Sequence, residues 1–141
     1  MLPRSLPRLC LFVVTATLCL GHGDDGGCGG GGEEEHHHEG SSGATCPSAG
    51  APTAQDFGSA FMERYCLSCH SASLTGRARR DAPEGMNFDT LEEVRRQAAA
   101  IDSHAAAGPN GVHSAMPPVS TPQPTRQERE RLGQWLACGA P

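Results

Sequence analysis

Residues 66–70 read CLSCH, and this string constrains the chain more than any other feature. In a helical segment, positions i, i+3 and i+4 share one face, so Cys66, Cys69 and His70 point the same way. Two thiols and an imidazole at this spacing are the attachment signature of a c-type haem. Each thiol bonds one vinyl group, and the histidine ligates the iron. The string therefore predicts one covalent haem c, bound by Cys66, Cys69 and His70.

Two other chemistries use a C-x-x-C pair. A structural zinc site requires two further ligands at suitable spacing. A thioredoxin-like redox pair is expected next to a βαβ pattern, which the sequence does not show. We therefore favour haem and keep a zinc-bound domain as a weaker alternative.

The N-terminus has the features of an export signal. Arg4 and Arg8 precede the mostly apolar run 9–20, which matches the n- and h-regions of a secretory signal. The run is too short to span a bilayer comfortably. We expect a signal peptide over residues 1–22 and a periplasmic or exported protein. Cys28 is a candidate for lipid attachment, and a lipid anchor at the N-terminus stays open as an alternative. The candidate is weak because acidic residues precede Cys28, where small or apolar residues would be expected.

Residues 23–45 are rich in glycine, acid and histidine and have no apolar periodicity. Such a segment buries too little surface to offset its ordering entropy, so it is predicted to be a flexible tether. Its His36–His38 cluster could bind metal weakly, but a solvated linker is the favoured interpretation. The tether leaves one small domain over residues 46–141.

The charge of this domain argues against nucleic acid as a partner. From Cys46 onward, ten acidic residues stand against nine arginines, and the chain has no lysine. A near-neutral domain of this kind has no basic stripe with which to contact phosphates.

Three helices are expected in the domain. Thr53 caps a helix that runs directly into the CLSCH string, Asp89 or Thr90 caps a second helix that continues to about Ile101, and Thr125 caps the last. Glu128 completes a capping box in the last helix. The remaining segments are expected to be a loop over 76–85, a turn over 108–111 and an extended segment that begins at Met116. The expected core residues are Phe57, Phe61, Tyr65, Leu132, Trp135 and Leu136.

Cysteine usage leaves one pairing to consider. Cys46 begins the domain and Cys138 nearly ends it, so in an oxidising compartment the two could form a disulfide. Sequence alone does not establish that connectivity.

Together these features resemble a class I c-type cytochrome over residues 53–138: a short helix leading into CLSCH, a middle helix, a Met116-Pro117-Pro118 loop and a final helix with Leu and Trp. The resemblance implies an all-α domain wrapped around one haem, with the first and last helices crossing. Phe57 and Phe61 would then pack near Leu132 and Trp135. It also implies an electron carrier rather than an enzyme, a monomer that serves redox partner proteins.

Met116 is the expected sixth iron ligand, because Pro117 and Pro118 stiffen its loop and because methionine is a known haem ligand. His113 in the same loop is its rival. Met86 is expected to pack and His104 to be solvated. An alternative function, a haem sensor or peroxidase-like domain, requires an open or labile sixth site.

Three arginines follow the motif closely: Arg77, Arg79 and Arg80. One or more of them could pair with the haem propionates, since guanidinium groups suit carboxylates. A solvated loop is an equally good interpretation of the same residues.

Overall fold

The computed structural model describes residues 40–141. The predicted signal peptide, lipid attachment at Cys28 and the tether up to residue 39 lie outside the described residues. Within 40–141, no helix is both long and apolar enough to cross a membrane.

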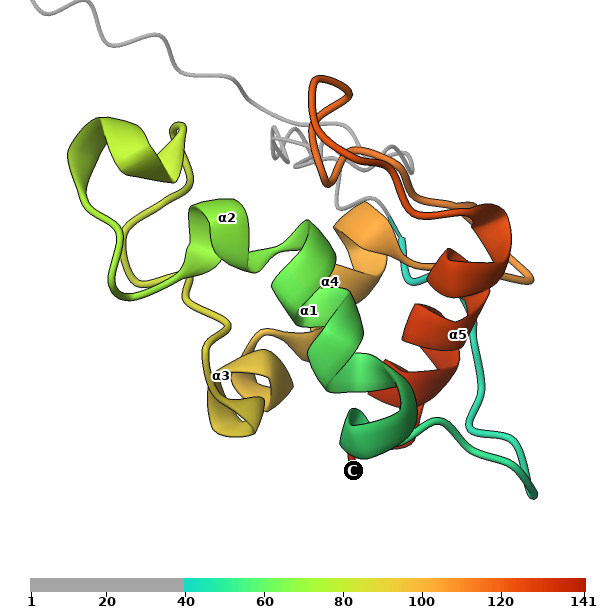
Figure 1. Cartoon of the computed structure of the whole chain (residues 1–141). Coiled ribbons are helices and arrows are strands. Elements are labelled where there is room, and N and C mark those ends of the chain that lie inside the picture. The colour runs from blue at the N-terminus through green and yellow to red at the C-terminus, as the bar shows by residue number, and fades with distance from the viewer. Residues whose placement is uncertain (1–39) are drawn as a thin grey trace, which may run out of the picture. The chain divides into compact units, whose positions relative to one another are not determined.

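The described part of the chain is mostly helical (Figure 1). Its elements follow in the order η1 (Ala54–Gly58), α1 (Ser59–Tyr65), α2 (Leu67–His70), η2 (Gly76–Arg79), α3 (Leu91–Arg96), α4 (Ala98–Ala105), β1 (Ala107–Gly108), β2 (Gly111–Val112) and α5 (Arg126–Ala137). Here η1 is a π-helical turn and η2 a 3₁₀ turn. The expectation of an all-α domain is therefore correct for the helices and omits a small sheet.

The sheet is a two-stranded antiparallel hairpin in which Ala107 pairs with Val112 and Gly108 with Gly111. The predicted turn over 108–111 is its connection. The strands were not predicted because two residues each are too few to show the alternation that marks a strand.

Each predicted helix begins with a reciprocal capping box. The pairs are Thr53 with Asp56, Thr90 with Glu93, and Thr125 with Glu128. In each pair, the threonine hydroxyl accepts a hydrogen bond from the backbone N–H of the acidic residue. The carboxylate of that residue in turn accepts one from the backbone N–H of the threonine. The middle helix differs from the expectation, because Gln97 leaves helical geometry (φ −103°, ψ 9°) and separates α3 from α4.

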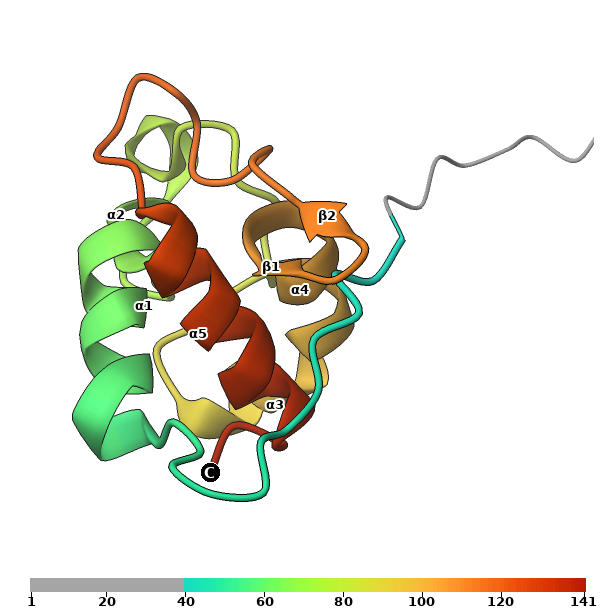
Figure 2. The same ribbon diagram turned by 90° about the vertical axis from the view of Figure 1, so that its right-hand side faces the viewer.

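The core forms where η1 and α1 pack against α5 (Figure 2). Leu132 and Trp135 on α5 are completely buried, and the predicted aromatic side chains of the first helix join the same cluster. Gly58 makes this approach possible, since a Cβ there would overlap the Trp135 ring.

A segment predicted to belong to the tether packs on the domain instead. The Ser42 side chain is fully buried, and its hydroxyl donates to Asp102 at 2.6 Å. The Ser42 N–H donates to the same carboxylate at 2.8 Å, and its carbonyl accepts from the Asn110 N–H at 2.9 Å. A Cβ on Gly133 would overlap Ala44, so α5 also meets this segment closely. These hydrogen bonds stabilise the ordered segment in a way that composition does not reveal, and among the described residues the packing extends back to Ser41.

Cys46 and Cys138 are joined by a disulfide across 92 residues of chain. By the entropy that such a loop removes from the unfolded chain, the bond contributes about 4–5 kcal/mol to stability. It fastens the residues before η1 to the end of α5.

Gly58→Ala is expected to destabilise the fold by about 1–3 kcal/mol, because the added methyl overpacks the contact with Trp135. Alanine's better helix propensity recovers only about 1 kcal/mol. Denaturant unfolding measures the change. Gly40→Ala is the matched control, since a Cβ there meets no atom within 4 Å. An unchanged midpoint in Gly58→Ala would contradict this account of the core.

Candidate functional site

The CLSCH string forms one helical turn that follows α1. The N–H groups of Cys69 and His70 both donate to the Cys66 carbonyl, at 3.1 and 2.9 Å. This turn carries the three predicted site residues at positions i, i+3 and i+4. Both cysteines are free thiols; Cys69 is buried and Cys66 partly buried.

The environment of Cys66 disfavours its thiolate. Burial, together with a smaller contribution from the nearby Cys69, raises the pKa of the Cys66 thiol to about 12. At neutral pH the Cys66 side chain is therefore a protonated thiol.

The His70 ring is fixed from two directions. Its Nδ1 lies 2.9 Å from the Met86 carbonyl oxygen, and its ring stacks on Phe88 with centroids 4.5 Å apart. A carbonyl only accepts hydrogen bonds, so Nδ1 carries the proton and the lone pair of the neutral ring is on Nε2. His70 is thus held in the tautomer that ligates a metal through Nε2.

Arg79 organises the loop between the motif and Phe88. It is 4% exposed, and its five N–H groups all donate to oxygens within this loop. Arg77 and Arg80 are exposed. Of the three arginines considered for haem propionates, Arg79 is therefore fully engaged elsewhere. Its burial left no sequence signal, because it depends on which carbonyls the loop turns inward.

The Met116 loop is held by a second buried arginine, Arg129 on α5. Its Nη1 donates to the Met116 carbonyl at 2.7 Å and to the carbonyls of Ala105 and His113 at 2.8 and 3.0 Å. Burial lowers the pKa of Arg129. The Met116 N–H donates to the His104 carbonyl at 2.8 Å. The backbone of Met116 is therefore fixed on both sides, while its side chain stays 39% exposed.

His113 offers a second candidate ligand atom. Its Nε2 is buried and has no hydrogen-bond partner among residues 40–141. Buried polar atoms normally have one, so an unpaired ring nitrogen suggests a ligand. The structure agrees with the other two expectations: His104 is exposed, and Met86 packs against the core.

The structure brings Cys66, Cys69 and His70 together but leaves Met116 and His113 on a different segment. In Figures 1 and 2, α2 and the orange-red segment between β2 and α5 lie toward the same end of the domain.

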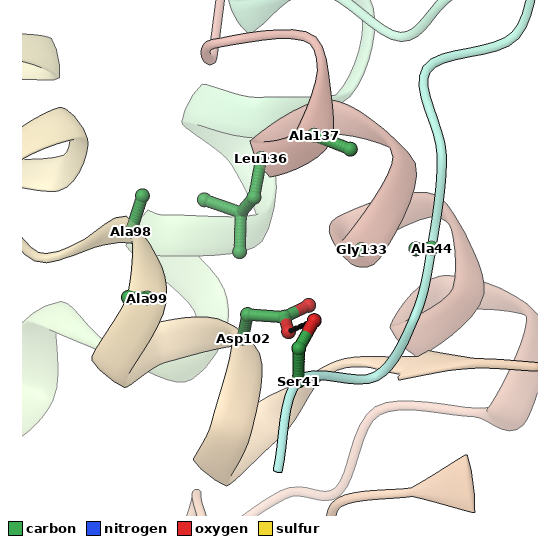
Figure 3. Close-up of a pocket in the computed structure, with 8 residues that line it drawn as sticks. All are labelled: Ser41, Ala44, Ala98, Ala99, Asp102, Gly133, Leu136 and Ala137. Carbon is green, nitrogen blue, oxygen red and sulfur yellow. Dashed lines mark hydrogen bonds between the residues drawn. The ribbon is translucent and has the colours of Figure 1, made fainter. Parts of the chain in front are cut away.

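Two cavities lie beside these elements, and neither is lined by the four predicted site residues. One of about 330 Å³ lies between α1 and α3 and includes Leu67 and Phe88 in its lining. The other, of about 200 Å³, lies between Ser41, α4 and α5. Figure 3 shows Asp102 turned toward Ser41 there, in an otherwise small and apolar lining. Since the carboxylate of Asp102 already accepts three hydrogen bonds, this second cavity is part of the domain's packing.

Within residues 40–141, no group of three or more His, Cys, Asp or Glu side chains is placed to hold a metal ion.

Comparison with protein-family models, with curated proteins and with solved structures gave no match. The case for a function therefore depends on the residues of the site and on their geometry.

We expect Cys66 to react slowly with iodoacetamide while the chain is folded and has no bound cofactor. With a pKa of about 12 against an ordinary value near 9, its thiolate is roughly a thousandfold rarer at pH 8. Because the unfolded thiol loses its proton first, the free energy of unfolding falls as pH rises from about 9 to 12. Mass mapping of the Cys66 peptide measures the labelling, with the denatured chain as control. A labelling rate that levels off near pH 9 would contradict the assigned environment.

Proposed function

We propose that this protein is an electron carrier with one covalent haem c, a domain of the class I c-type cytochrome kind. The observation that carries the proposal is the His70 ring. Its Nδ1 is bonded to the Met86 carbonyl, so Nε2 is free on the same helical turn as two unpaired thiols.

The residues of this turn fit the group chemically. Two thiols are required for the two thioether bonds and one imidazole nitrogen for the iron, and Cys66, Cys69 and His70 supply them. When bound, the haem supplies one-electron chemistry, since its iron alternates between ferric and ferrous states. Met116 would be the second axial ligand and would raise the reduction potential relative to a second histidine.

Three groups of the protein itself fix the positions of the proposed ligand residues. The Met86 carbonyl orients His70, Phe88 supports the ring face, and Arg129 fixes the backbone of Met116. A fixed His70 ring and a fixed Met116 backbone would help a bound iron to keep the same ligands in both oxidation states. That property suits outer-sphere exchange with a redox partner protein and requires no general acid or nucleophile.

We further propose that the protein works outside the cytoplasm, in the periplasm or after export, as a monomer. The support is the signal-like sequence at residues 1–22 and the disulfide between Cys46 and Cys138, a bond that persists in oxidising compartments. A lipid anchor near Cys28 would place the domain beside a membrane.

A haem sensor or peroxidase-like domain is the second candidate. The observation that favours it is the 39% exposure of the Met116 side chain, since a poorly packed thioether leaves the iron more easily than a buried one. Rapid binding of carbon monoxide to the ferrous protein would support this candidate over a simple carrier.

The attachment of haem is tested by expressing the chain with a c-type cytochrome maturation system and recording the pyridine haemochrome spectrum. We expect a spectrum of two thioether bonds and a haem that stays with the chain in denaturing gels. Cys66→Ala and Cys69→Ala should each lose a thioether bond, which shifts that spectrum. The double variant Cys46→Ala/Cys138→Ala is the matched control and should keep the unshifted spectrum. A chain that matures without haem would refute the proposal.

The sixth ligand is tested in the ferric protein by the sulfur-to-iron charge-transfer band at the red edge of the visible spectrum. Met116→Ala should abolish this band and allow carbon monoxide to bind the ferrous protein quickly. His113→Ala is the matched control from the same loop and should leave both properties unchanged. If the band is missing in the unaltered protein and His113→Ala opens the site, His113 is the ligand.

A further inference from the structure

We propose that Arg79 is the positioning residue of this site: it fixes the carbonyl that orients His70 and thereby raises the reduction potential of the iron. The inference goes beyond the proposed electron transfer and depends on it, because a potential can be measured only with haem bound.

The guanidinium of Arg79 is saturated by the loop that it organises. Its Nε donates to the Ala82 carbonyl at 3.2 Å, and its Nη1 donates to the Ser71 carbonyl at 2.8 Å and to Asn87 Oδ1 at 3.0 Å. Its Nη2 donates to the carbonyls of Pro83 and Met86 at 2.8 and 3.2 Å. Arginine has five N–H donors, and all five are used.

One of these acceptors is the oxygen that holds His70. The Met86 carbonyl accepts from Arg79 Nη2 at 3.2 Å and from His70 Nδ1 at 2.9 Å. The segment is also tied to the histidine through Phe88, whose N–H donates to the His70 carbonyl at 2.9 Å. Arg79 therefore acts on His70 through a shared atom.

The shared carbonyl has an electronic consequence. A cationic donor on the Met86 oxygen draws electron density from it and weakens its pull on the Nδ1 proton. The imidazole then donates less electron density to the iron, which favours the ferrous state. The buried positive charge itself favours the ferrous state as well, since its five direct acceptors are neutral oxygens. The carboxylate of Asp89, whose pKa is lowered by its bonds to Ser71 and Ala72 and by Arg79, offsets part of this charge.

The backbone around Arg79 shows why such an anchor is required. Arg80 and Asp81 both have left-handed backbone angles, with φ of 49° and 68°. Residues other than glycine adopt this conformation only at a cost, so the surrounding contacts have to maintain it. The bonds of Arg79 connect both ends of this strained turn.

The experiment compares three variants of the haem-loaded protein: Arg79→Gln, Arg79→Lys and Arg77→Gln. The first removes the charge and the fork of donors, and the second keeps the charge but loses the fork. The third removes one exposed charge from the same loop and is the matched control. The readouts are the midpoint potential and the solvent exchange of the His70 Nδ1 proton measured by NMR.

We expect Arg79→Gln to lower the potential and to speed the Nδ1 exchange on the order of tenfold, the factor that a charge-assisted hydrogen bond provides. Arg79→Lys should speed the exchange similarly and recover part of the potential. Arg77→Gln should change neither property. A potential and an exchange rate in Arg79→Gln equal to those of the unaltered protein would overturn the inference.

A measurement on the unaltered protein keeps the test decisive if the Arg79 variants do not fold. Five engaged donors should give Arg79 separate, slowly exchanging guanidinium proton signals. A single averaged Nη signal would show a free guanidinium and overturn the inference. Failure of haem attachment would refute the proposed function, whereas attached haem with an unaffected potential would refute only the role of Arg79.

Discussion

The contact between Trp135 on α5 and the backbone at Gly58 is the constraint on which the other parts of this domain depend. It sets how closely the first and last helices approach. The motif follows α1 directly, and Arg129 on α5 holds the Met116 loop. The approach of the two helices thus positions the start of the motif and the helix whose arginine holds the Met116 backbone. The Tyr65 hydroxyl, which donates to Glu128 at 3.0 Å, fixes the same helices near the motif.

Long connections in so small a domain have few regular hydrogen bonds, and buried arginines replace them. Arg79 holds the loop after the motif, and Arg129 holds the segment from Ala105 to Gln123. A guanidinium suits this work because its five donors point in one plane toward several carbonyls. The loop that orients His70 and the loop that carries Met116 are each arranged around such a group.

Much of the fold could be predicted because the signals were local. Capping boxes at Thr53, Thr90 and Thr125 mark helix starts by bonds between residues three apart. The break at Gln97, the hairpin and the docked segment at Ser42 were not predicted. The docked segment arises from contacts between residues distant in the chain, such as that of Ser42 with Asp102, and no local pattern encodes them. The hairpin was missed because two residues per strand show no alternation.

The sequence by itself determined the chemistry at residues 66–70, since the helical period alone places two thiols and an imidazole on one turn. For the proposed haem, it favours Met116 as the sixth ligand, with His113 as the rival. Which ring nitrogen of His70 is free follows only from the tertiary structure, because the Met86 carbonyl that accepts the hydrogen bond from Nδ1 belongs to another segment. The tertiary structure likewise distinguishes Arg79 from the two similar arginines beside it, since Arg79 alone of the three is buried and burial depends on long-range folding of the chain.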